Sequence, residues 1–407
     1  MTDLALIADD LTGAADSGVP FAMAGFSTAI PFDTPRREAA DVLAFSTESR
    51  DVPVREAERR VRGALTAVFG RDGSMRPAWI YKKMDSVLRG HPVEELLITM
   101  QVARVQRVVV APALPSQGRT TVGGVIFDHG VPLTETAMGK EHGRENLVHL
   151  FQRASRTPVR SISLGTVRGS ARDLRNALSA PGSWIAVADA ETEADLDAIA
   201  TVGIAAGIRV FSGSAGLTNV LARRLPIHQL QRPPAVQARS GPVLVVAGSR
   251  HAATSRQLRQ LEEAGAVVIR LDQAHVDEED VSFAELRTVL RVALSGSAPV
   301  VVTADGLGPA KLGGAGVSRR LAEAVAIEGL HEQVAGLVMT GGDVAAAVCR
   351  QLGVKTIWLR GEVSPAIPWG TVTAGAFAGL PIVTKAGSFG GDTAMAEAVR
   401  LIEGLRG

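Results

Sequence analysis

Short apolar runs alternate with segments of helical periodicity along almost the whole chain, and polar turns separate them. Such runs are typical of strands that are buried on both faces of a parallel sheet. Their alternation with helices predicts an α/β fold in which mainly parallel sheets are flanked by helices. The predicted strands are Leu4–Ala8, Val42–Phe45, Ala78–Tyr81, Val108–Ala111, Trp184–Ala188, Ile208–Phe211, Val243–Ala247, Ala266–Arg270, Pro299–Thr303, Gly336–Met339, Thr356–Leu359 and Ile382–Thr384.

The chain has 407 residues, which is more than one hydrophobic core usually holds, so we predict two domains. The stretch Pro226–Pro242 is polar, rich in proline and without periodicity, as linkers are. We therefore predict an N-terminal domain over residues 1–228, a linker over 229–241 and a C-terminal domain over 242–407. Two α/β domains that face each other form a cleft, where ligands commonly bind, so we expect the active site in this interdomain cleft.

Charge and cysteine content exclude several classes of protein. Lys and Arg number 43 against 42 Asp and Glu, so the chain lacks the basic excess of a general nucleic-acid binder. The single cysteine, Cys349, cannot form an intrachain disulfide, which fits a reducing compartment. The N-terminus lacks a signal-peptide pattern, and prolines interrupt the longest uncharged stretch, Val363–Thr384. We expect a cytoplasmic protein with neither nucleic acid nor a membrane as its partner.

The segment Tyr81–His91 holds the densest group of chemically useful side chains. An arginine grips a carboxylate or phosphate bidentately, a lysine adds a point charge, and an aspartate can accept a proton from a hydroxyl. The segment therefore predicts a site for an anionic substrate, although a solvated charge cluster explains it equally well in isolation. Its candidate residues are Lys82, Lys83, Asp85, Ser86 and Arg89.

Polar loops follow three further predicted strands. Asp9 and Asp10 follow the first strand, at the carboxyl end where ligands of open α/β sheets bind. They could bind substrate hydroxyls, help to hold a metal or act as a base, but helix capping is the simpler role. We expect one of them to cap and the other to face the cleft. Arg50 follows the second strand, and Gly118 and Arg119 follow the fourth, which favours one pocket for an anion.

Three Gly/Ser loops in the C-terminal half each follow a predicted strand and precede a helix. Glycine lets backbone amides approach a phosphate, and a helix N-terminus offers free N–H donors. One such loop is an ordinary turn, but three at equivalent places predict a nucleotide phosphate site. The candidate residues are Ser249, Gly341, Gly342, Asp343, Val344, Gly387 and Gly390.

Missing motifs narrow the chemistry. The sequence contains no G-x-x-x-x-G-K-[ST], so the chain is not a P-loop enzyme. It also lacks a complete G-x-G-x-x-G, which weakens a nicotinamide-dinucleotide site, and G-x-S-x-G, the mark of a serine nucleophile.

Together these segments resemble the four-carbon acid sugar kinase family, formerly a family of unknown function. The resemblance implies an N-terminal domain that binds a sugar acid and a C-terminal domain that binds ATP. It covers nearly the whole chain through the segments Asp9–Gly13, Lys82–Gly90, Ala111–Thr120, Ser212–Leu217, Gly248–Ser249, Thr340–Asp343, Gly361–Val363 and Lys385–Gly390.

The family phosphorylates the terminal hydroxyl of four-carbon sugar acids with ATP and Mg²⁺. By resemblance, D-threonate is the expected substrate, with 3-oxo-tetronate and D-erythronate as alternatives; a homodimer is left open. The residues implied in sugar-acid contact are Asp10, Arg50 and Lys82–Asp85, and those in ATP contact are Ser249, Gly341–Val344 and Gly387.

We expect Asp85, with Asp10 as the second choice, to accept the proton of the attacking hydroxyl. Asp343 is the candidate Mg²⁺ ligand, or else a helix cap. Two rival functions are an NAD(P)-dependent hydroxy-acid dehydrogenase and a non-catalytic sugar-acid sensor.

The sequence departs from the family pattern at three places. These departures do not contradict a kinase function, but they leave the identity of the substrate open. Val344 and Val87 stand where the family often has threonine, and the usual Asp-Pro element is missing from Ala137–Glu141.

Overall fold

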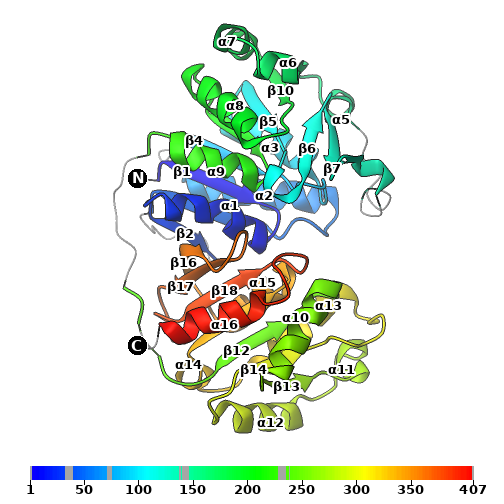
Figure 1. Cartoon of the computed structure of the whole chain (residues 1–407), viewed down its shortest axis with the longest axis vertical. Helices are drawn as coiled ribbons and strands as arrows, with labels where there is room; N and C mark the ends of the chain where they lie inside the picture. Colours follow the sequence, from blue (N-terminus) through cyan, green and yellow to red (C-terminus); the bar gives the residue numbers. More distant parts are fainter. Residues whose placement is uncertain are drawn as a thin grey trace. The chain divides into compact units, whose positions relative to one another are not determined.

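The computed structural model describes residues 2–32, 40–70, 76–136, 139, 146–227, 235–237 and 239–405 (Figure 1). Most of the predicted linker, and all of the segment 137–141 except residue 139, lie outside these residues. The chain divides into two compact units: Met1–Thr28 with Thr34–Gln231, and Ala29–Asp33 with Arg232–Gly407. Both units have strands flanked by helices, which confirms the predicted α/β class.

The first unit is built on a parallel sheet, in which every predicted strand of the first half is present. Apolar side chains are buried along both faces, which the continuous apolar runs had indicated. The order across the sheet is β3 (Val42–Ser46), β1 (Leu4–Ala8), β4 (Trp79–Lys83), β11 (Val210–Gly213), β5 (Arg107–Ala111), β10 (Trp184–Ala188) and β9 (Val159–Ile162).

Helices pack in two groups against this sheet. One group joins α1 (Leu11–Met23), α8 (Glu193–Ala205) and α9 (Ala215–Arg224), and another joins α2 (Val54–Phe69) to α3 (Pro92–Ala103). The remaining described helices of the unit are α5 (Leu147–Ala154), α6 (Leu164–Val167) and α7 (Ala171–Ser179). A separate small antiparallel sheet consists of β6 (Arg119–Val122), β7 (Val125–Asp128) and β8 (Val131–Pro132), which the sequence analysis did not predict.

The second unit combines parallel and antiparallel strands. The parallel part has the order β13 (Val267–Arg270), β14 (Val300–Thr303), β12 (Val243–Ala247), β15 (Gly336–Thr340) and β18 (Pro381–Lys385). Antiparallel pairing then adds β17 (Pro368–Val372), β16 (Thr356–Glu362) and β2 (Thr28–Pro31). Neither β17 nor β2 was predicted, because both contain proline and lack a continuous apolar run. Residues 29–31 of β2 belong to this unit, although they precede most of the first.

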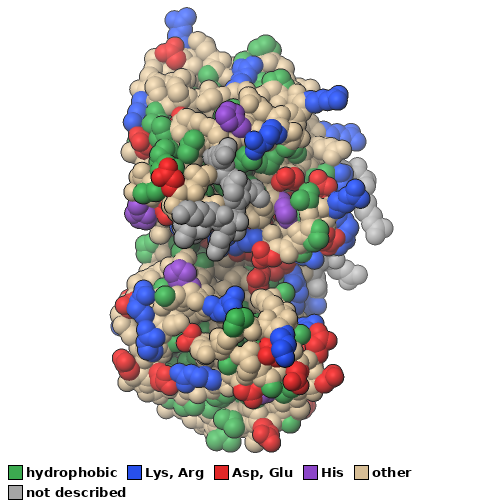
Figure 2. All heavy atoms as spheres, turned by 90° about the vertical axis from the view of Figure 1, so that its right-hand side faces the viewer, with side chains coloured by type: hydrophobic (Ala, Val, Ile, Leu, Met, Phe, Trp, Pro, Cys, Tyr) green, Lys and Arg blue, Asp and Glu red, His purple; other side chains and the backbone are tan. Residues whose placement is uncertain are grey.

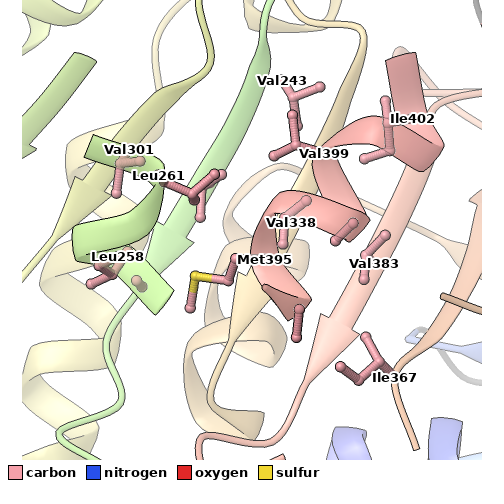
Figure 3. Close-up of a cluster of buried hydrophobic side chains, with 14 of the residues drawn as sticks. Val243, Leu258, Leu261, Val301, Val338, Ile367, Val383, Met395, Val399 and Ile402 are labelled. Carbon is pink, nitrogen blue, oxygen red and sulfur yellow. The ribbon is translucent and has the colours of Figure 1, made fainter. Parts of the chain in front are cut away.

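The helices of the second unit cover its sheet. Figure 3 shows Leu258 and Leu261 of α10 (Ala252–Glu263) and Met395 of α16 (Ala394–Gly404) with Val243 and Val338 of the strands in one buried cluster. The opposite side of β12 is buried as well, and α15 (Gly342–Gln351) packs there against α13 (Gly313–Val325). The other described helices are α11 (Gln273–Asp277), α12 (Ala284–Leu294) and α14 (Leu330–Gln333).

The surface bears charges of both signs. On the face drawn in Figure 2, acidic and basic side chains are interspersed, in keeping with the balanced composition. Among the described residues, no helix combines the length and apolar character that a membrane crossing requires.

Candidate active site

The charged cluster of the first unit lies at the carboxyl edge of its sheet. Strands β3, β1 and β4 are neighbours and parallel, so the residues that follow them meet at one edge. Asp9 and Asp10 follow β1, Arg50 follows β3, and Asp85 follows β4. The structure therefore brings together residues that the sequence analysis assigned to separate loops. Lys82 and Lys83 are the last residues of β4 rather than part of the loop after it.

Arg50 is the centre of this cluster. Its guanidinium binds Asp9 bidentately (Nε–Oδ2 2.8 Å, Nη2–Oδ1 3.0 Å), contacts Asp10 at 2.6 Å and reaches Asp85 at 3.7 Å. Burial lowers the pKa of Arg50, but the three aspartates outweigh burial and raise it well above its ordinary value. Burial raises the pKa of Asp9, and Arg50, Lys82 and Lys83 bring it below its ordinary value. Arg50 thus organises protein carboxylates.

Asp10 has a second task as the N-cap of α1. Its carboxylate accepts hydrogen bonds from the Gly13 amide at 2.7 Å and from the Thr12 hydroxyl at 2.8 Å. A Cβ at Gly13 would lie 2.6 Å from Asp10 Oδ1, so this turn requires glycine. The expectation that one of the two aspartates caps the helix is confirmed, and the capping residue is Asp10.

Asp85 is held by its own loop. It accepts hydrogen bonds from the Val87 amide at 3.0 Å and from Arg89 Nη2 at 2.7 Å. Burial raises its pKa, but Arg89, Arg50 and Lys83 outweigh burial and hold the pKa well below its usual range. Asp85 is therefore ionised at neutral pH. The Arg89 side chain is 46% exposed, so its guanidinium can also meet a ligand from solvent.

Lys82 and Lys83 differ although they are adjacent. Lys82 forms an ion pair with Glu95 of α3 (Nζ–Oε2 2.7 Å), and both side chains are only 1% exposed. The Ser49 hydroxyl donates to the same carboxylate. Lys83 Nζ donates to the Met84 carbonyl at 3.1 Å, and among the described residues no carboxylate lies within ion-pair distance of it. Lys83 is therefore the better placed of the two to take an anionic ligand.

The sequence analysis missed Glu95. The available signal was weak: an acidic residue on the apolar side of a helix close to the cationic segment. Its partner, Lys82, was predicted to face the ligand, whereas its charge is already balanced inside the protein.

We expect Glu95→Gln to lower the free energy of unfolding by about 3–5 kcal/mol, because it leaves the buried Lys82 ammonium without its counter-charge. Urea unfolding followed by circular dichroism measures this loss. Glu56→Gln is the matched control, since Glu56 pairs with arginines at the surface, and it should change stability little. Equal effects of the two substitutions would contradict the assigned importance of the buried pair.

The small sheet brings a further cation to the substrate loop. Arg119, the first residue of β6, donates from Nη1 to the Ser86 hydroxyl at 3.1 Å and lies 3.6 Å from Asp128. Gly118 precedes it with φ +67°, and a Cβ there would lie 2.7 Å from the His129 ring. The structure thus places Gly118, Arg119 and Ser86 together, as a shared pocket requires.

The three glycine loops of the second unit follow neighbouring parallel strands. The loops after β12, β15 and β18 meet at one edge because β15 lies between the other two. Ser249 contacts both neighbouring loops: a Cβ on Gly387 would lie 1.9 Å from its hydroxyl oxygen, and one on Gly341 would lie 3.8 Å from its amide. The close approach at Gly387 tolerates no side chain.

The N-terminus of α15 lies within this group. Gly341 has φ +100° and, as N-cap, supplies no side-chain hydrogen bond, so the first turn has no side-chain cap. Asp343 is exposed in that turn. Val344 is buried, and a Cβ on Gly248 would lie 2.5 Å from its methyl group. Val344 therefore packs beneath the loop, which accounts for an apolar residue at this position. Gly390 has φ +78° in the loop that precedes α16.

These two groups of residues suit different ligands. The first unit offers carboxylates that can accept hydrogen bonds from hydroxyl groups. Beside them lie Lys83, Arg89 and Arg119, which can bind an acid group. The second offers glycine amides and an open helix N-terminus, the features that bind phosphates in proteins.

Comparison with known proteins agrees with this division. A family model described as a sugar-binding N-terminal domain matches residues 4–221, and one described as a nucleotide-binding C-terminal domain matches residues 244–395. The crystal structure of a Salmonella typhimurium LT2 protein has the same fold, with a TM-score of 0.81 over 98% of this chain and 100% of that one, at 23% identity.

Three curated relatives are each 32% identical to the chain. A D-threonate kinase of Salmonella typhimurium aligns over 98% of this chain and 98% of its own length. A D-erythronate kinase of Heliobacterium modesticaldum aligns over 97% and 95%, and a 3-oxo-tetronate kinase of Methylobacterium radiotolerans over 95% and 96%. The chain therefore belongs to the four-carbon acid sugar kinase family, as the resemblance in its sequence implied.

Proposed function

We propose that the chain is an ATP-dependent kinase that phosphorylates the terminal (4-) hydroxyl of a four-carbon sugar acid, with D-threonate as its substrate. The observation that carries the proposal is the cluster of Asp10, Arg50 and Asp85 beside Lys83 and Arg89. A small hydroxy acid needs carboxylates that accept hydrogen bonds from its hydroxyls and cations that bind its acid group, and Lys83 and the half-exposed Arg89 can serve as such cations. The relatives named D-threonate kinase support the choice of substrate.

We assign the sugar acid to the N-terminal domain, residues 1–228, and ATP to the C-terminal domain, residues 242–407. The two family models support this assignment. Phosphoryl transfer needs the γ-phosphate of ATP to reach the substrate hydroxyl, so the proposed reaction requires the two bound ligands to meet.

In the proposed mechanism the protein positions charges and the nucleophile. Lys83 and Arg89, with Arg119, bind the substrate carboxylate, while Arg50 holds Asp9, Asp10 and Asp85 in place. Asp85 accepts a hydrogen bond from the terminal hydroxyl and takes its proton during transfer; Asp10 is the second candidate. Because the pKa of Asp85 is lowered, it is a weak base. Orientation and charge stabilisation therefore contribute more than proton removal.

The ATP site is proposed to consist of Ser249, the turn Gly341–Val344, Gly387 and Gly390. Mg²⁺ in kinases is held by one or two carboxylates together with the substrate's phosphates, and it neutralises charge on the transferring group. Among the described residues no three acidic, histidine or cysteine side chains form a metal cluster. A Mg²⁺ site formed by one protein carboxylate and the phosphates of ATP fits this arrangement. We assign Asp343 as that carboxylate.

A coupled assay of ADP release tests the function. The purified protein is mixed with ATP, Mg²⁺ and one acid at a time: D-threonate, D-erythronate or 3-oxo-tetronate. We expect release that depends on the acid and is fastest with D-threonate. Faster release with another of these acids would identify that acid as the substrate and still support the kinase activity. Release with none of the acids would overturn the proposal, and reduction of NAD(P) by a hydroxy acid would establish the dehydrogenase instead.

A further inference from the structure

Lys385 is not among the residues proposed above to bind ATP or the sugar acid. It is the last residue of β18, opens the glycine loop 385–391, and is only 1% exposed. Its ammonium donates three hydrogen bonds to carbonyl oxygens of that loop: Ala386 at 2.9 Å, Gly387 at 3.3 Å and Phe389 at 3.0 Å. Each N–H of the ammonium is therefore used to fix the loop backbone.

Helix α10 donates further hydrogen bonds to the same loop. The Thr254 hydroxyl donates to the Gly387 carbonyl at 3.0 Å. The Gln257 amide nitrogen donates to the carbonyls of Phe389 (3.2 Å), Gly390 (3.2 Å) and Gly391 (2.8 Å). Five of the seven loop carbonyls, those of residues 386, 387, 389, 390 and 391, thus accept hydrogen bonds from Lys385 or α10.

This arrangement determines where the loop amides point. In a planar trans peptide the carbonyl of one residue and the N–H of the next point in opposite directions. Because the carbonyls of Ala386 and Gly387 are drawn to the ammonium, the N–H groups of Gly387 and Ser388 point away from it. Gly387 is also the residue that packs against the Ser249 hydroxyl. The loop consequently presents amide donors beside Ser249.

The charge of Lys385 is not balanced by a carboxylate of the described residues. All three of its partners are neutral carbonyls, and among the described residues no carboxylate lies within ion-pair distance. Holding a cation in such a site is unfavourable, and burial lowers the pKa of Lys385 to about 8. An anion bound to the loop amides that point away from Lys385 would supply the missing counter-charge.

We propose that Lys385 is the positioning residue of the glycine loop 385–391 and supplies the buried positive charge against which the nucleotide's phosphates bind. The inference rests on the proposed function, because it assigns the phosphates of ATP to this loop.

Calorimetric titration with ATP, ADP, AMP and adenosine tests the inference. We expect Lys385→Met to weaken ATP binding at least about tenfold, with smaller losses for ADP and AMP and little change for adenosine, because charge attraction grows with the number of phosphates. Thr254→Val is the matched control. It removes a neutral hydrogen bond to the same loop, so it should weaken ATP, ADP and AMP by a similar, few-fold factor and leave adenosine nearly unchanged.

The outcomes separate this inference from the proposed function. Failure of the wild-type protein to bind ATP would refute the function. Wild-type binding together with equal losses for ATP, ADP and AMP in Lys385→Met would refute the charge role and leave only loop support. Lys385→Gln, which keeps donors but not the charge, should behave like Lys385→Met, and unchanged ATP affinity in it would also overturn the inference.

If neither variant folds, thermal unfolding of the wild-type protein tests whether the loop binds phosphate groups. Pyrophosphate, but not sodium chloride at equal ionic strength, should then raise the melting temperature, and no such rise would overturn the inference.

Discussion

Arg50→Met is expected to reduce sugar-acid-dependent ADP release by at least about 10³-fold while leaving ATP affinity unchanged. The substitution removes the one guanidinium that joins Asp9, Asp10 and Asp85, so three carboxylates lose their shared partner. Removal of one partner of a buried ion pair typically costs about 3–5 kcal/mol, so stability should fall as well. Steady-state kinetics, ATP titration and urea unfolding measure the three effects.

The stability loss should depend on pH in a definite direction. Asp9 and Asp85 have pKa values below their ordinary ones in the folded protein, so their pairing stabilises the fold above the unfolded carboxyl pKa of about 3.9. That contribution disappears as the pH falls through the lowered values. The difference between wild type and Arg50→Met should therefore be largest near neutral pH and shrink below about pH 4.

Two further variants make the Arg50 result specific. Arg59→Met removes an arginine that is 72% exposed and should leave turnover unchanged. The double variant Arg50→Met with Asp9→Asn should recover part of the lost stability, since it removes one of the stranded charges. Wild-type turnover in Arg50→Met would show that the cluster is not the substrate site.

Gly342→Asp is expected to abolish ATP binding. Gly342 is the first residue of α15, and in the proposed ATP site an added carboxylate there would lie against the phosphates. Two like charges about 4 Å apart repel by about 4 kcal/mol at an effective dielectric constant near 20, which corresponds to about 10³-fold in affinity. Calorimetric titration with ATP measures the loss.

The helix itself should tolerate this change, because an acidic residue in the first turn interacts favourably with the helix dipole. Thermal unfolding without nucleotide should therefore show little loss of stability. Gly342→Asn has nearly the same shape without the charge and should retain most of the ATP affinity. Equal binding by the Asp and Asn variants would remove this turn from the phosphate site.

The sequence was sufficient to predict the described parallel strands except β9, together with the residue types at their ends. Leu4–Ala8, Trp184–Ala188 and Val243–Ala247 occur with the predicted bounds, because a strand buried on both faces is a continuous apolar run. Strands β17 and β2 were missed because both are antiparallel and contain proline, and β17 also contains glycine, so neither is a continuous apolar run. A helix cap by one of the two aspartates was anticipated because capping is a local interaction, and the structure shows that it is Asp10.

By itself, the sequence determined the α/β class, the family and the set of polar residues at the strand ends, since local periodicity and short motifs encode all three. Tertiary structure alone decided which of those residues are engaged. Arg50 meets Asp9 across 41 positions, Glu95 neutralises Lys82, and Thr254 reaches the loop of Lys385 across 133 positions. The physical reason is that ion pairs and hydrogen bonds depend on distances of a few ångströms, which strand order in the sheet sets and spacing along the chain does not.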